Sequence, residues 1–267
     1  MKLLFLNFYG WFKRNSLNLC AIFLCVYLLF ISILNIGHNN IKIFFSIIAI
    51  LLIVIFVLFY NKLKHVYETM IKELTMQGDI QKAKQSEQKL IQLDKWKGYN
   101  KSIVLFQSLL LLDQGKWEEL SELLHKETQF FHSSFDYLAI YNYLKFKLAY
   151  FTGNISLLDE YYLKFNEIMH AGKIKHPLFS CDEVDGIYFY AHHRYKKSLN
   201  CFKKIQFNSM NTREQAYVQF ELAQTYSALN QIHDRNKALQ FVKEEVPQFY
   251  IAHLANQKEG IHFEKLA

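Results

Sequence analysis

The sequence predicts an all-α protein with an N-terminal transmembrane helical hairpin followed by an α-solenoid of about five helix-turn-helix units. Three observations support this prediction. Two long apolar stretches lie within the first 60 residues, turn-forming residues are scarce beyond them, and the few turn residues that remain are evenly spaced. Because 267 residues suffice for one or two domains, the membrane part and the remaining helices are considered separately.

The two apolar stretches are each long enough to cross a membrane. Of the 18 residues from 19 to 36, 12 are Leu, Ile, Phe or Val, and in 43–60 the number is 15. Neither window contains Asp, Glu, Lys or Arg. At about 1.5 Å per residue, such a helix nearly crosses a hydrocarbon core of roughly 30 Å. We therefore expect two transmembrane helices, at about 17–36 and 41–60. The alternatives are buried core helices and a cleaved signal peptide.

The basic residues near these stretches predict the topology. Three precede the first stretch, two follow the second at 62 and 64, and one lies between them. Positive charge accumulates on the cytoplasmic side, so we expect a multi-pass protein of the cell membrane with its N-terminus and C-terminal domain in the cytoplasm. Residues 1–16 contain five aromatic rings and are interpreted as an interfacial segment; the alternative is an extension of the first span.

Charge and cysteine content narrow the classes of function. The first 60 residues contain four basic and no acidic residues, whereas the remainder contains 27 basic and 24 acidic residues. This balance argues against binding to nucleic acid. The four cysteines show no paired spacing, which is typical of a protein in a reducing compartment.

Evenly spaced turns divide the chain after residue 61. We take Gly78, Gly115, Gly153, His193 and Asn230 as turn positions, and their spacings of 37, 38, 40 and 37 indicate a helix-turn-helix repeat. Glycine and asparagine tolerate positive φ at a helix end. Each turn is followed two residues later by a large apolar side chain: Ile80, Trp117, Ile155, Tyr195 and Ile232.

Two segments carry a resemblance to a known family. The stretch "QGDIQKAKQSEQKLIQLDK" (77–95) resembles the second half of a tetratricopeptide repeat, and "ELAQTYSALNQIHDRNKALQF" (221–241) resembles the first helix and turn of another. The positions that match the family pattern are Leu222, Ala223, Tyr226 and Ala238, with Gly186 and Phe189 in the fourth unit. The resemblance covers about 60–245, although the units are longer than the family's period of about 34 residues.

The resemblance implies a tetratricopeptide-like repeat domain at 61–246, which the distribution of basic residues places in the cytoplasm, and a C-terminal capping helix with its tail at 247–267. Since no Gly or Pro interrupts 43–77, we also expect the second span to continue without a break into the first helix of this domain. In this family the concave groove binds partners. The residues that would line the groove here are Tyr143, Lys147, Tyr150, Ile187, Tyr190, Tyr217, Phe220 and Gln224.

Residue patterns for catalysis or cofactor binding are missing from the sequence. It has no Gly-rich phosphate loop, His-Glu-x-x-His motif or nucleophile elbow. Cys181, His192, His193 and Cys201 lack the spacing of zinc ligands and are interpreted as turn and core residues. The acids of "DEVD" (182–185) are expected to stabilise a helix start. We expect no enzyme activity, no cofactor and no metal.

The sequence therefore favours a membrane-anchored, non-enzymatic scaffold or adaptor whose helical-repeat domain binds a protein or peptide partner. The transmembrane helices offer a surface for a homo-oligomer. Two rival functions stay open. One is a sensory or regulatory subunit of a membrane complex that binds a peptide or small ligand in the repeat groove; the other is a membrane enzyme with unrecognised catalytic residues.

Overall fold

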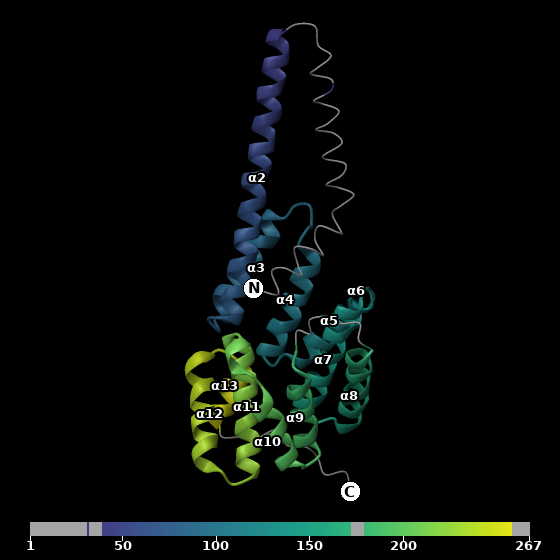
Figure 1. Cartoon of the computed structure of the whole chain (residues 1–267). Coiled ribbons are helices and arrows are strands. Elements are labelled where there is room, and N and C mark those ends of the chain that lie inside the picture. The colour runs from purple at the N-terminus through teal and green to yellow at the C-terminus, as the bar shows by residue number, and fades with distance from the viewer. Residues whose placement is uncertain (1–30, 32–38, 172–178, 258–267) are drawn as a thin grey trace. The chain divides into compact units, whose positions relative to one another are not determined.

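The computed structural model describes residue 31, residues 39–171 and residues 179–257, and every regular element in these ranges is a helix (Figure 1). The all-α class is therefore confirmed for the described part of the chain. The predicted interfacial segment 1–16 lies outside it, as do the first predicted span 17–36, apart from Ile31, and the tail from residue 258. The chain divides into two compact units, Met1–His65 and Val66–Ala267.

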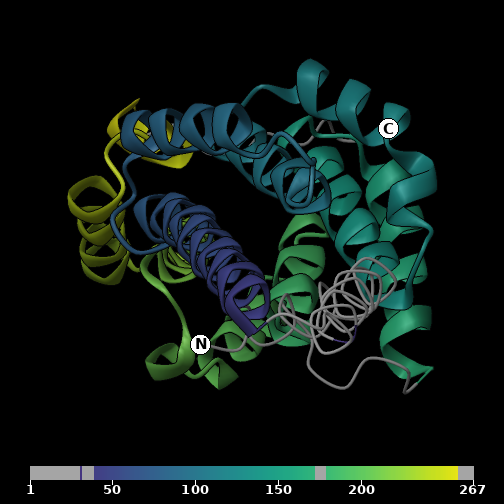
Figure 2. The same cartoon turned by 90° about the horizontal axis from the view of Figure 1, so that it is seen from above.

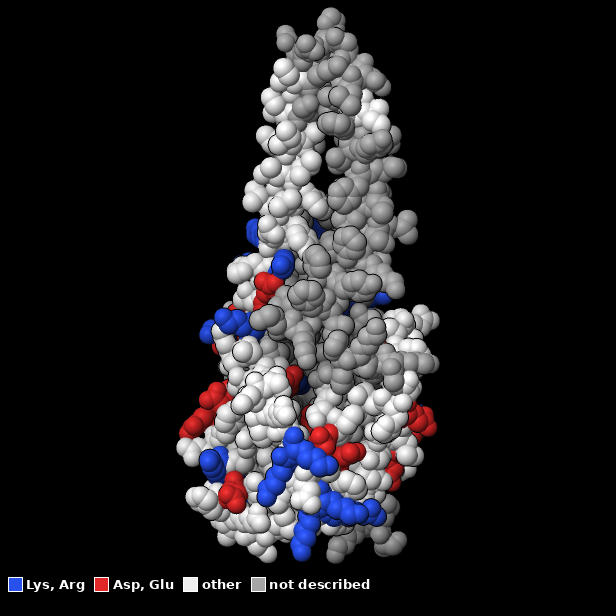
Figure 3. All heavy atoms as spheres, in the orientation of Figure 1, with Lys and Arg blue, Asp and Glu red and all other residues white. Residues whose placement is uncertain are grey.

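Helix α2 (Asn39–Thr75) contains the second predicted span. It runs without a break through 60–65, as the absence of Gly and Pro predicts. Its stretch Ile47–Thr75 is the one described helix that is long and apolar enough to cross a membrane. The large apolar side chains that the structure describes from 43 to 58 are mostly exposed, with Leu58 at 63%. Figure 3 shows the described side chains in the upper part of α2 without blue or red charged residues.

The second unit consists of the last ten residues of α2 and a series of shorter helices. Most of these helices form consecutive pairs: α4 with α5, α7 with α8, α9 with α10, and α11 with α12. Their bounds are α3 Ile80–Leu93, α4 Asn100–Asp113, α5 Trp117–Lys126, α6 Thr128–Phe131, α7 Phe135–Phe151, α8 Ile155–His170, α9 Cys181–Ala191, α10 Tyr195–Lys204, α11 Thr212–Ala228, α12 Ile232–Glu245 and α13 Tyr250–Gln257, with a 3-10 turn at Phe207–Ser209.

All five predicted turn residues adopt the left-handed conformation. Their φ angles are 61° at Gly78, 67° at Gly115, 72° at Gly153, 59° at His193 and 58° at Asn230. Because this conformation reverses the chain within two residues, each turn directs the following helix back along the preceding one. His193 occupies it without being a glycine or asparagine, which explains why the fourth turn is the least obvious in the sequence.

Four of these turns close their helix with the same pair of hydrogen bonds. After α4, the Gly115 amide donates to the Leu112 carbonyl at 3.1 Å and the Lys116 amide donates to the Leu111 carbonyl at 3.0 Å. The equivalent bonds follow α7, α9 and α11. This arrangement is the Schellman motif, which satisfies carbonyls that a helix end would otherwise leave unpaired.

The ends of the helical series meet within the second unit. Helices α4, α7, α9 and α11 contact one another in sequence order, as stacked repeats do. However, α4 also contacts α11, because Arg213 binds Asp113 across 100 residues of sequence. The segment that leads into α13 packs near the first turns, where the Gln81 backbone amide donates to Gln248 Oε1 at 3.2 Å. Figure 2 shows yellow α13 beside blue α3.

An aromatic contact also joins α13 to α5. The Tyr250 ring of α13 lies edge-on to Trp117 of α5, with ring centroids 5.1 Å apart. It fills the space beside Gly115, where a Cβ atom would lie 2.4 Å from the ring. An open array has contacts only between neighbouring units. This unit instead forms a closed series around a common interior.

Candidate functional site

The eight residues predicted to line a groove lie on three adjacent helices. Helix α7 carries Tyr143, Lys147 and Tyr150, α9 carries Ile187 and Tyr190, and α11 carries Tyr217, Phe220 and Gln224. The structure brings them together, since α7 packs against α9 and α9 against α11. Seven of them are buried, with exposed fractions from 0% to 7%, and Tyr190 is half-buried. The seven buried residues pack within the unit, and one of them, Gln224, also borders a pocket.

Lys147 is the centre of this interior. Its side chain is fully buried, and its Nζ lies 3.3 Å from Glu183 Oε1 and 3.4 Å from Glu221 Oε1. The ammonium also lies over the Tyr217 ring, 4.7 Å from its centroid. A buried ammonium is stable only when its charge is paired, and both carboxylates and the aromatic face serve that purpose here.

A second buried ion pair joins α11 to α4. The Arg213 guanidinium donates to Asp113 through Nε, at 2.8 Å from Oδ2, and through Nη2, at 2.8 Å from Oδ1. Tyr217 donates its hydroxyl to Asp113 Oδ1 at 2.9 Å. The two-point geometry is the strongest arrangement of arginine with a carboxylate. It connects the first and last parts of the helical series.

Two further tyrosines complete the hydrogen bonding of the glutamates. Tyr143 donates its hydroxyl to Glu183 Oε1 at 2.9 Å, and Tyr150 donates to Glu221 Oε2. Burial, followed by the neighbouring carboxylate, raises the pKa of both tyrosines well above its ordinary value. Both hydroxyls therefore keep their protons and act as donors. We call the set Asp113, Tyr143, Lys147, Tyr150, Glu183, Arg213, Tyr217 and Glu221 the charged cluster.

The charged cluster contains three carboxylates and two cations, so it carries one excess negative charge when all five groups are ionised. Burial raises the pKa of Glu221 to about 7, although Lys147 acts in the opposite direction. Burial also raises the pKa of Asp113, and Arg213 offsets only part of this effect. Protonation of Glu221 would remove the excess charge. The cluster is thus close to a change of protonation state at neutral pH.

Sequence reasoning identified only part of this cluster. Asp113, Arg213 and Glu221 were not singled out, and Glu183 was interpreted as a residue of a helix start. One signal was available for α11, where Arg213, Tyr217, Glu221 and Gln224 recur at helical spacing beside apolar neighbours. The partners of Arg213, Tyr217 and Glu221 lie on other helices, at sequence separations of 71 to 104 residues. Only the packing of the helices reveals the pairing.

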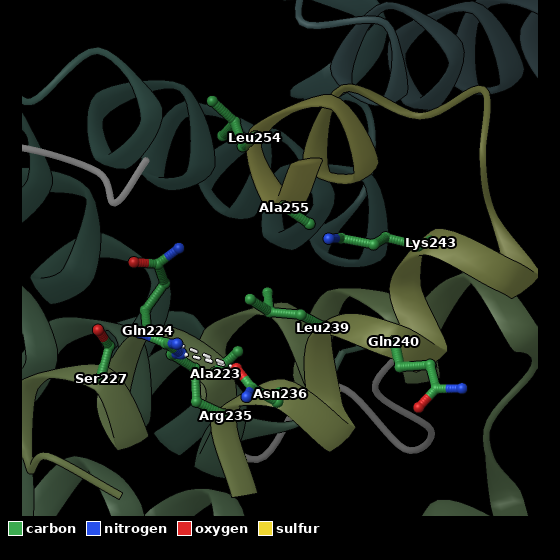
Figure 4. Close-up of a pocket in the computed structure, with 10 residues that line it drawn as sticks. All are labelled: Ala223, Gln224, Ser227, Arg235, Asn236, Leu239, Gln240, Lys243, Leu254 and Ala255. Atoms are coloured by element: carbon green, nitrogen blue, oxygen red, sulfur yellow. Dashed lines mark hydrogen bonds between the residues drawn. The ribbon is translucent and has the colours of Figure 1, made fainter. Parts of the chain in front are cut away.

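The arrangement offers hydrogen bonding and charge but no recognisable metal site. Within residues 39–171 and 179–257, no group of three His, Cys, Asp or Glu side chains is placed to hold a metal ion. His192 bonds Asp159 through Nε2 at 2.6 Å, Cys201 is buried and Cys181 is exposed. A pocket of about 450 Å³ lies next to the predicted groove residue Gln224, between α11, α12 and α13 (Figure 4).

Comparison with known proteins adds no family. No family model, no curated protein and no solved structure matches the chain.

Proposed function

We propose that this chain is a membrane-anchored, non-enzymatic scaffold or adaptor whose helical-repeat domain binds a protein or peptide partner. The observation that carries the proposal is the contrast between the exposed apolar part of α2 and the helical unit that follows it. The apolar side chains of 43–58 are exposed, whereas the residues after 66 form a helical unit with its own buried core. An exposed apolar helix suits a lipid environment, and an independent helical unit suits recognition of a partner.

In this proposal the unit is a solenoid similar to tetratricopeptide repeats, and the anchor is a hairpin of the spans 17–36 and 41–60. Support for the repeat comes from the evenly spaced left-handed turns and from the contacts of α4, α7, α9 and α11 in sequence order. Support for a cytoplasmic domain comes from the distribution of basic residues around the two apolar stretches.

A second candidate function is a sensory or regulatory subunit of a membrane complex. The closed interior favours it, since the residues predicted to line a groove are bonded to one another through the charged cluster. A peptide that used these residues would first have to separate α13 from the first turns. Binding would then be coupled to a change between closed and open forms.

In-cell crosslinking of the full-length protein, followed by mass spectrometry, tests both functions. Tyr250→Ser weakens the closure, because it removes the ring beside Gly115 and Trp117. Tyr188→Ser is the matched control, because Tyr188 stacks on Tyr162 with ring centroids 3.7 Å apart, away from that junction. Circular dichroism of both purified variants establishes that they fold.

The outcomes separate the two functions. The adaptor proposal expects one dominant partner, captured equally by the original protein and both variants. The regulatory proposal expects capture to increase with Tyr250→Ser and to stay unchanged with Tyr188→Ser. If no partner exceeds the background of an unrelated membrane protein, both functions that involve a protein or peptide partner are wrong.

The exposed thiol of Cys181 provides a test of the topology. A cytoplasmic domain predicts that a membrane-impermeant maleimide labels Cys181 only after the cells are permeabilised. Burial raises the pKa of this thiol, so the reaction is run at mildly alkaline pH. Cys181→Ser identifies the labelled site. Labelling of Cys181 in intact cells would contradict the proposed topology.

A further inference from the structure

The pocket between α11, α12 and α13 has the composition of a binding site for a small anion. Arg235 and Lys243 of α12 line it, and none of its lining residues is Asp or Glu. Neither cation forms an ion pair with a carboxylate anywhere in the described chain. The pocket therefore has two cations and no carboxylate on its wall, and the acid bonded to a lining residue is Glu244, which accepts from Gln240.

The Arg235 guanidinium is held in position by its neighbour. Its Nε and Nη2 donate to Asn236 Oδ1 at 3.2 Å and 3.0 Å. Figure 4 shows these two bonds as dashed lines. Because the amide occupies only part of the guanidinium, further N–H groups can donate to a ligand. Arginine is suited to carboxylates and phosphates because its planar fork matches two oxygens.

Gln224 adds a side-chain amide to the wall of the pocket. The residue as a whole is only 7% exposed, and its side chain makes no hydrogen bond within residues 39–171 and 179–257. The amide atoms remain accessible, because Gln114 Oε1 is the one fully buried polar side-chain atom without a partner in these ranges. Figure 4 shows the Gln224 side chain at the pocket, on the wall that faces α13. A ligand in the pocket would satisfy this amide.

The size and the apolar walls of the pocket limit the kind of anion. The volume of about 450 Å³ falls within the range of small-molecule sites. Leu239 of α12 and Leu254 of α13 add apolar surface beside the cations. An inorganic ion would make no apolar contact with these leucines. A compact organic anion would use both kinds of surface.

We propose that this pocket binds a small organic anion, a carboxylate or a phosphate ester with a compact apolar body. Arg235 and Lys243 bind the anionic group, and Gln224 bonds a polar atom of the ligand. Leu239 and Leu254 contact its apolar part. This inference goes beyond the proposed partner recognition, since it assigns a separate small-molecule site that needs no partner protein.

Fluorine NMR of the full-length protein in neutral detergent tests the site. The probes are para-fluorobenzoate, para-fluorophenyl phosphate and the neutral para-fluorobenzamide, and their line widths are titrated against protein. We expect saturable binding of at least one anionic probe and weaker binding of the amide. A preference between the two anions distinguishes carboxylate from phosphate ester as the class of ligand.

Variants locate the binding. Arg235→Gln/Lys243→Gln removes both charges. It should weaken the binding of the anionic probe at least about tenfold, because charge-assisted hydrogen bonds are lost. Lys196→Gln/Lys197→Gln removes the same charge from the exposed face of α10 and should leave binding unchanged. Gln224→Leu should weaken binding while both cations remain.

Three results would overturn the inference. They are the absence of saturable binding by either anion at millimolar concentration, equal binding of the neutral amide, and equal weakening by the α10 control. Circular dichroism of each variant shows that the fold is kept. Because no partner protein is present, the result is independent of whether the adaptor function holds.

Discussion

The exposed part of α2 and the charged cluster of the second unit distribute their residues in opposite ways. In α2, apolar side chains from 43 to 58 face outward, as Leu58 does with 63% of its surface exposed. In the charged cluster, Lys147 and Asp113 are fully buried. In each region the surroundings determine whether a side chain is stable at its position. Apolar residues are stable outside when the surroundings are lipid, and charges are stable inside when each has a partner.

The comparison also shows which region is the more costly to form. Moving paired charges out of water has a desolvation penalty that their attraction often fails to offset. Burial raises the pKa of Asp113 even though Arg213 acts in the opposite direction, which is the sign that such a penalty produces. We therefore attribute the stability of the unit to its apolar core and the specificity of its closure to the charged cluster.

The largest expected effect comes from placing charge in the apolar region. Leu51→Lys/Ile55→Lys should oppose insertion of α2 by roughly 6 kcal/mol in total, because each lysine costs about 3 kcal/mol at the centre of a membrane helix. The share of full-length protein that remains in the membrane after alkaline extraction should fall. Leu51→Ala/Ile55→Ala is the matched control. If the lysine variant stays wholly in the membrane, α2 is not the anchor, and residues 17–36 would hold the protein there.

Breaking the ion pair in the charged cluster should give the next largest effect. Arg213→Met leaves Asp113 buried without a counter-charge and should lower the free energy of unfolding by roughly 3–5 kcal/mol. Urea unfolding of the protein in micelles, followed by circular dichroism, measures the change. The double variant Asp113→Leu/Arg213→Met removes both charges and should recover most of the loss. A double variant as unstable as the single one would contradict this account.

The protonation of Glu221 predicts a dependence of stability on pH. Its pKa of about 7 in the folded protein lies above the ordinary value of 4.5 for a glutamate, so the folded state binds the proton more tightly. Stability from this group is therefore present below the unfolded pKa and is lost as the pH rises through 7. We expect the Tm to fall between about pH 5 and pH 8.

Glu221→Gln separates this group from the other carboxylates whose pKa is raised by burial, which include Glu87, Asp113 and Glu214. The variant should make the Tm less dependent on pH over the same interval. Glu214→Gln is the comparison within the same helix and should change the dependence less. An unchanged slope in Glu221→Gln would assign the pH dependence to a different group.

The smallest expected effect comes from an ion pair at the surface. Lys116 and Glu119 form a pair that is 45% and 55% exposed. Lys116→Gln should change the free energy of unfolding by less than about 1 kcal/mol, because solvent and salt weaken such pairs. Measured alongside Arg213→Met, it gives the contrast between an exposed and a buried ion pair. A loss as large as that of Arg213→Met would contradict the comparison.

Local features of the fold could be predicted from the sequence because they depend on neighbouring residues. Each predicted turn position has a positive φ, and α2 continues to Thr75 where no Gly or Pro interrupts it. The helical class of the described chain follows from the same scarcity of turn residues. The first apolar stretch and the interfacial segment stay predictions, as does the resemblance to tetratricopeptide repeats.

For the candidate site, the sequence predicts only which residues share one face of a helix. The spacing of Tyr143, Lys147 and Tyr150 places them on one side of α7, and this is local information. Whether that side faces solvent depends on what packs against it. The resemblance implied that these residues line a groove, and this stays a prediction. The structure adds that Glu183 and Glu221 lie against Lys147.

By itself the sequence determined where the helices turn and which stretch of α2 is apolar, because backbone conformation and hydropathy are properties of short segments. The tertiary structure decided that the helical series closes, that Asp113 meets Arg213 across 100 residues, and that Gln224 borders a cationic pocket. Such pairings depend on the summed angles and lengths of many helices, and small differences between units accumulate along the chain. No short segment contains that information.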